Sequence, residues 1–127
     1  MSLVKQSESI VGRKSYHFAL AIIELYKNLS IEKREFILSK QVLRSGTSIG
    51  ANINEALSGE SKRDFVHKMS ISLKEARETS YWLNLLSDIG FIEKEKSAVL
   101  TGNCEELIKM LTSIILTTKE KYLTKKL

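Results

Sequence analysis

Not one of the 127 residues is proline, so the residue that breaks helix interiors most strongly is absent from the whole chain. Proline lacks the backbone N–H and clashes with the preceding helical turn. Only six glycines and the helix-capping residues are left to interrupt a sequence rich in Leu, Ile, Lys and Glu. The sequence therefore predicts long helices and disfavours strands.

Apolar residues recur at helical spacing in four segments, roughly 9–29, 33–58, 61–88 and 93–125. One face of the first segment contains Val11, Phe18, Ile22, Leu25 and Leu29. One face of the second contains Leu38, Val42, Gly46, Ile49, Gly50, Ile53, Ala56 and Leu57. Short loops between long helices favour an all-α, antiparallel up-down-up-down four-helix bundle in a single domain, residues 1–127.

Glycines inside the second segment test this interpretation. Gly46 and Gly50 are one turn apart on the apolar side, and each costs about 1 kcal/mol relative to alanine in a helix interior. We expect them to permit close approach of a neighbouring helix, with a break in the helix as the alternative.

Three other features predict where helices begin and end. Ser61 and Asp64 have the spacing of a capping box at the start of the third helix. Gly90 is the expected C′ residue after it. We also expect a short turn before Gly102 in the fourth segment.

Charge and cysteine content limit the classes of function that this chain could have. Twenty Lys and Arg against fifteen Asp and Glu give a net charge of +5, which favours association with an anion such as nucleic acid without requiring it. The single cysteine, Cys104, excludes an internal disulfide framework and is expected to be a packing thiol. No apolar run has the length of a signal peptide or membrane span, so we expect a cytoplasmic protein without a membrane partner.

The second helix also has polar residues on the side opposite its apolar face. We call this set the polar stripe: Arg44, Ser48, Asn52 and Glu55. Arg44 and Glu55 are too far apart along one helix to pair with each other except through intermediates such as Ser48 and Asn52, and a partner surface could complete them. The stripe is expected either to be solvated or to contact another subunit.

The third helix has cations in line on one face. We call this set the basic ridge: Arg63, His67, Ser70, Lys74, Arg77 and Tyr81. Its cations could contact phosphates, its serine could donate a hydrogen bond, and its tyrosine could stack on an exposed base. The alternative is an ordinary solvated face.

Catalytic chemistry has few candidate residues. Two histidines and one cysteine cannot form a structural zinc site, and no carboxylate cluster indicates a di-iron bundle, so no metal, cofactor or small-molecule substrate is expected. Small helical ribonucleases of the HEPN class are similar in size and use an Arg with a nearby His. This chain has two such pairs, Arg13 with His17 and Arg63 with His67, with fewer residues between Arg and His than in that class. Their i,i+4 spacing still places each pair on one helix face, where the histidine could act as an acid or base.

Two segments carry a family resemblance. Residues 44–56, RSGTSIGANINEA, followed by 61–67, SKRDFVH, resemble the core motif of four-helix-bundle proteins encoded in intervening sequences of bacterial 23S ribosomal RNA genes, often called S23 ribosomal proteins. The likeness spans about residues 12–123. It implies a homo-oligomer, a pentamer as in the related accessory proteins of diversity-generating retroelements, where a basic barrel cooperates with a reverse transcriptase and RNA. The matching positions are Arg44, Ser48, Asn52 and Glu55, assigned to subunit contact or bundle-end hydrogen bonding.

These observations favour a non-enzymatic oligomer that binds structured RNA or a nucleic-acid enzyme through basic helix faces. A protein-interaction scaffold without nucleic acid is the first alternative, and a HEPN-like ribonuclease is the second.

Overall fold

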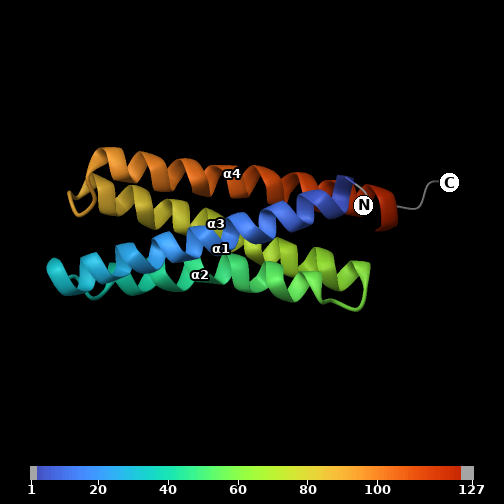
Figure 1. The fold of residues 1–127 in the computed structure, drawn as a ribbon, viewed down its shortest axis with the longest axis horizontal. Coiled ribbons are helices and arrows are strands. Elements are labelled where there is room, and N and C mark those ends of the chain that lie inside the picture. The colour runs from blue at the N-terminus through green and yellow to red at the C-terminus, as the bar shows by residue number, and fades with distance from the viewer. Residues whose placement is uncertain (1–2, 124–127) are drawn as a thin grey trace.

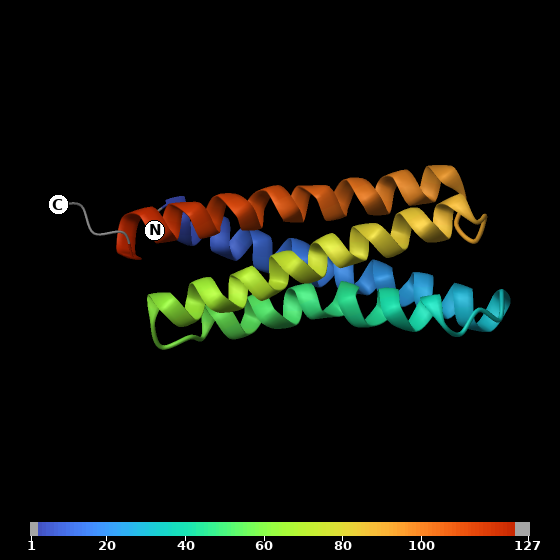
Figure 2. The same cartoon turned by 180° about the vertical axis from the view of Figure 1, so that it is seen from behind.

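The computed structural model describes residues 3–123, and this part of the chain is helical from end to end apart from short connections (Figure 1). The elements in chain order are α1 (Leu3–Lys27), the π-helical turn η1 (Asn28–Glu32), α2 (Leu38–Leu57), α3 (Lys62–Asp88), α4 (Lys94–Thr118) and the π-helical turn η2 (Lys119–Leu123). Each long helix packs against two others in the cyclic order α1, α2, α3, α4, which leaves α1 and α3 on opposite corners (Figures 1 and 2). The predicted all-α, four-helix bundle is confirmed.

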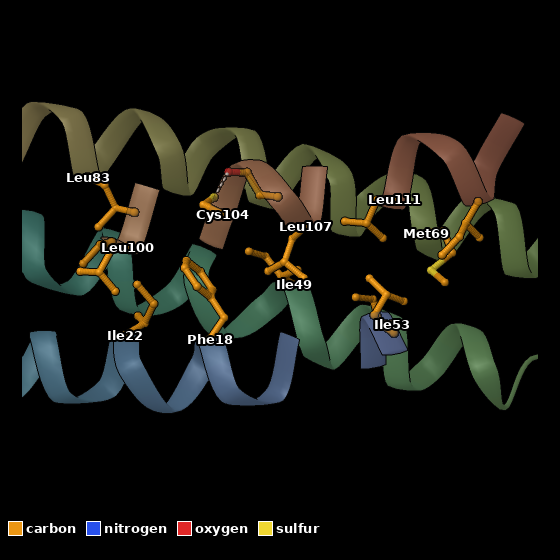
Figure 3. Packing of buried hydrophobic residues seen from close by; sticks show 14 of the residues in the cluster. Phe18, Ile22, Ile49, Ile53, Met69, Leu83, Leu100, Cys104, Leu107 and Leu111 are labelled. Carbon is orange, nitrogen blue, oxygen red and sulfur yellow. Dashed lines mark hydrogen bonds between the residues drawn. The ribbon is translucent and has the colours of Figure 1, made fainter. Parts of the chain in front are cut away.

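The core runs the length of the bundle and takes side chains from all four helices (Figure 3). All five residues predicted for the first helix, from Val11 to Leu29, are buried. The second helix also buries most of its predicted apolar face. Leu57 is an exception at 45% exposed, because α2 ends there and its side chain lies at the outer edge.

Gly46 and Gly50 lie inside an unbroken α2 and face α1, as the close-approach interpretation predicts. A Cβ atom on Gly46 would lie 2.8 Å from Cγ2 of Ile22, and one on Gly50 would lie 3.2 Å from Oγ of Ser15. Real Cβ atoms do not approach neighbours at the first of these distances. The two glycines therefore set how closely α1 and α2 pack.

The second helix begins at Leu38, so the predicted start at residue 33 is wrong. Residues 33–37 form a turn in which Arg34 has a left-handed backbone, φ 51°. The Glu35 carboxylate then accepts hydrogen bonds from the backbone N–H groups of Ile37, Leu38 and Ser39. These bonds satisfy N–H groups that a helix start leaves without partners, so Glu35 caps α2 from outside the helix.

The other predicted boundaries have mixed outcomes. Ser61 Oγ accepts from the Asp64 N–H at 3.0 Å, which confirms the serine cap of α3. Gly90 has φ 86°, and the Phe91 N–H donates to the Leu86 carbonyl, which confirms a glycine C′. The turn before Gly102 is wrong, because α4 passes through this exposed position without interruption. The first helix starts at Leu3 instead of 9, and the predicted end of the fourth, 124–125, lies outside the described residues.

Candidate nucleic-acid interface

The six residues of the basic ridge are all exposed along the outer face of α3. At 1.5 Å per residue, positions 63 and 81 lie about 27 Å apart along a single rigid helix. Within residues 3–123, Arg63, Lys74 and Arg77 make no ion pair or side-chain hydrogen bond. Three positive charges therefore face solvent in a row without a carboxylate partner from the described chain.

The polar stripe lies along the interface between α2 and α3, and residues of α3 form ion pairs with both of its charged ends. Arg44 donates to Glu75 at 3.1 Å and also to Glu78. Glu55 accepts from Lys68 at 3.3 Å. The neighbouring helix of the same chain thus supplies a partner for each of these charges, while both side chains stay more than half exposed, at 52% for Arg44 and 57% for Glu55.

Ser48 and Asn52, the middle of the stripe, are half-buried, and among residues 3–123 their side chains bond only to their own helix. Ser48 Oγ donates to the Arg44 carbonyl at 2.6 Å, and Asn52 Nδ2 donates to the Ser48 carbonyl at 2.9 Å. Contact of the stripe with another subunit stays a prediction.

Buried hydrogen bonds fix the register of α2 against α3. Ser72 Oγ donates to the Ile49 carbonyl at 2.8 Å, and Thr79 Oγ1 donates to Ser45 Oγ at 2.8 Å. All four residues are inaccessible to solvent. Arg44, the residue before Ser45, is held opposite the turn of α3 that contains Glu75 and Glu78.

Two aromatic residues lie at one end of the ridge. Tyr81 is 59% exposed, and its ring lies edge-on to Trp82 with the centroids 5.1 Å apart. The Trp82 Nε1–H donates to Glu78 at 3.1 Å, on the carboxylate that also binds Arg44. The sequence did not reveal this Arg44–Glu78–Trp82 connection, because it joins two helices. The i,i+4 spacing of Glu78 and Trp82 was its only local signal.

The two Arg–His pairs lie far from each other and do not form a joint site. His17 lies on α1 and His67 on α3, at opposite corners of the bundle, and all four residues of the pairs are exposed. The groove beside His17, between α1 and α4, is bridged by an ion pair from Lys14 to Glu106 at 3.0 Å. In the described part of the chain both imidazoles are thus open to solvent, and neither is enclosed in a way that would align it on a phosphodiester.

The cysteine is a packing residue, as predicted. Cys104 is fully buried, and its thiol donates to the Ala76 carbonyl at 3.1 Å (Figure 3). Burial, with a smaller contribution from the nearby Glu105 carboxylate, raises the pKa of the thiol to about 12. The thiolate needed for nucleophilic chemistry is therefore suppressed. Among residues 3–123, no three His, Cys, Asp or Glu side chains gather as a metal site would require.

One surface was missed by the sequence analysis. A groove of about 450 Å³ runs between α1 and α2, and its lining contains no charged side chain. Most of its lining residues are small, and the lining also includes the exposed side chains of Tyr16 and Leu57. The signal that could have located it was the set of small residues on the facing sides of the two helices: Gly12, Ser15, Ala19, Gly50 and Ala51.

Known proteins similar to this chain share its sequence pattern and its fold. Residues 7–113 match the family model described as 23S rRNA-intervening sequence protein. A crystal structure of a protein with unknown function from the S23 ribosomal protein family of Bacteroides thetaiotaomicron is 48% identical, with a TM-score of 0.85, covering 87% of this chain and 98% of its own. No curated protein matches the sequence. Within the described residues, none of the helices has both the length and the apolar character needed to span a membrane.

Proposed function

The chain belongs to the 23S rRNA-intervening sequence protein family, and on that premise we propose that it is a non-catalytic, self-associating helical protein that binds structured RNA through its basic ridge. The observation that carries the proposal is the row of three exposed cations on α3 that have no carboxylate partner in the described chain. Phosphate contacts supply most sequence-independent affinity for nucleic acid, and they require unneutralised Lys and Arg.

Each ridge residue has a distinct role in this proposal. Arg63 and Arg77 present guanidinium forks that match phosphate oxygens, and Lys74 adds a point charge between them. Ser70 donates a hydrogen bond to the RNA sugar-phosphate backbone, and His67 donates a second one to it. Tyr81 offers an exposed ring on which an unpaired base stacks, as bases in RNA loops and bulges do on protein aromatic residues.

Self-association strengthens this binding. A net charge of +5 per chain is modest, but a symmetric assembly presents several ridges to one RNA. Once one ridge is bound, the others bind at high effective concentration. A reverse transcriptase is a further partner to be tested once RNA binding is established.

The uncharged groove between α1 and α2 favours a second candidate, a protein-interaction scaffold that binds no nucleic acid. Exposed apolar surface of this kind is a common feature of protein interfaces. The two candidates differ in whether the purified chain binds RNA in low salt.

The test is fluorescence anisotropy with a labelled RNA hairpin in low salt. We expect the wild type to bind, and the variant with Arg63, Lys74 and Arg77 all changed to Glu to lose at least about tenfold in affinity. The matched control changes Lys40, Lys96 and Lys109 to Glu, which alters the net charge equally at exposed lysines on α2 and α4. Equal losses in the two variants, or a wild type that does not bind, would contradict the proposal.

A further inference from the structure

Two carboxylates lie beside the ridge and would oppose its binding to phosphate. Glu75 and Glu78 follow Lys74 on the same helix, and both are only partly exposed, with side-chain values of 15% and 33%. Glu78 is four residues after Lys74, the spacing at which oppositely charged side chains meet on a helix. A Glu78 that paired with Lys74 would neutralise the middle of the ridge.

The structure shows where these carboxylates are directed instead. Arg44 reaches from α2 and contacts both, with one guanidinium nitrogen on Glu75 and another on Glu78. The Trp82 indole donates to the same Glu78 oxygen, so Glu78 is held from two sides. Lys74 is exposed and has no ion-pair partner among the described residues.

We propose that Arg44 is a positioning residue for the ridge: it binds Glu75 and Glu78 on the α2 side of α3 and thereby leaves Lys74 available to phosphate. The inference rests on the proposed function, because it assigns a role within the same RNA-binding surface. It does not place Arg44 in contact with RNA. The guanidinium suits this role because it has several donors in a fixed fork and stays charged, so one residue can bind two carboxylates at once.

The geometry also connects this network to the stacking residue. Glu78 accepts from Trp82, and the Trp82 ring lies against Tyr81. Fixing Glu78 therefore helps to fix the indole behind the exposed tyrosine. Trp82 is the only tryptophan in the chain, so its fluorescence reports on this network without a label.

The experiment is a double-mutant cycle between Arg44 and Lys74, measured by anisotropy with the labelled RNA hairpin over a range of salt concentrations. In the wild type, we expect Lys74→Met to weaken binding severalfold and to make the dependence of log K on log salt less steep. Arg44→Met should weaken binding by a similar factor. Adding Lys74→Met to Arg44→Met should then cause little further loss of affinity. In the Arg44→Met variant Glu78 is already paired with Lys74, so this lysine no longer contributes to RNA binding.

A rescue variant separates this role from a general loss of stability. Glu78→Gln removes the charge but retains an oxygen that can accept from Trp82. In the Arg44→Met background it should restore most of the affinity and the sensitivity to Lys74→Met. Lys14→Met is the matched control, since it removes one cation and one ion pair between helices on another face, and it should leave affinity nearly unchanged. Arg44→Met, but not Lys14→Met, should alter Trp82 emission in the absence of RNA.

Arg44→Lys is a second variant if Arg44→Met unfolds, as judged by circular dichroism. A single ammonium group should retain part of the coupling to Lys74. Independent, additive effects of residues 44 and 74, or no rescue by Glu78→Gln, would overturn the role of Arg44 even if the ridge binds RNA. Undiminished binding by the ridge variant with three glutamates would instead overturn the proposed function, and the role of Arg44 with it.

Discussion

Single residues decide how closely α1 and α2 approach, and Gly46 gives the sharpest case. An added methyl group would meet the Ile22 side chain, which is fully buried and branched at Cβ, so it has little freedom to move. Overpacking of this kind costs about 1–3 kcal/mol, whereas alanine gains about 1 kcal/mol over glycine in a helix interior. Steric overlap should therefore outweigh helix propensity at this position.

We predict that Gly46→Ala lowers the free energy of unfolding by up to about 2 kcal/mol, as measured by urea denaturation. Gly102→Ala is the matched control, because Gly102 is also inside a helix but has open space around the added Cβ. That variant should be more stable than the wild type by about 0.5–1 kcal/mol. Stabilisation by both substitutions would contradict the close-packing role of Gly46.

At the scale of helices, the start of α2 depends on a residue outside it. The Glu35 carboxylate accepts three backbone N–H groups, of which the Ser39 bond is the shortest at 2.7 Å. Burial by itself would raise the pKa of Glu35, but the hydrogen bonds from Leu38, Ser39 and Ile37 together outweigh it and lower the pKa. The folded state thus favours the ionised carboxylate.

This shift makes the contribution of Glu35 to stability dependent on pH. Because its pKa is lower in the folded chain than the ordinary 4.5, the stabilisation is present above pH 4.5 and is lost as pH falls through the folded value. We predict that Glu35→Ala costs about 1 kcal/mol at neutral pH and that the difference from wild type narrows in acid. Thermal unfolding at several pH values measures this. Glu32→Ala, at an exposed position in the preceding turn, should show no such convergence.

Helices could be predicted from the sequence where the signal was local. Apolar spacing located the buried faces, and Gly90 and Ser61 marked helix ends through chemistry contained within a few residues. The start of α2 was misplaced because glutamate is an uncommon cap and its hydrogen bonds reach two to four residues ahead. The ridge was visible as a pattern on one helix. The pairing of Arg44 with Glu75 and Glu78 was not visible, since it depends on the register between two helices.

At the scale of the whole molecule, the proposed RNA binding depends on whether copies of the bundle assemble. The charged ends of the polar stripe are already paired within the chain, so we test contact between subunits at its uncharged middle, Ser48 and Asn52. Both are half-buried. An arginine at position 52 would introduce a long charged side chain into such a contact while leaving the ridge on α3 unchanged.

We predict that the wild type has a mass several times that of one chain by light scattering, and that Asn52→Arg shifts it toward the monomer. Asn84→Arg, at an exposed position on α3, is the control and should keep the larger mass. Loss of assembly should weaken RNA binding by about 100-fold or more even though each ridge is intact, because linked sites gain about 10²–10⁴ in avidity. A monomeric wild type would contradict the assembly, whereas an oligomeric Asn52→Arg variant would move the contact to another surface, with the uncharged α1–α2 groove the next to test.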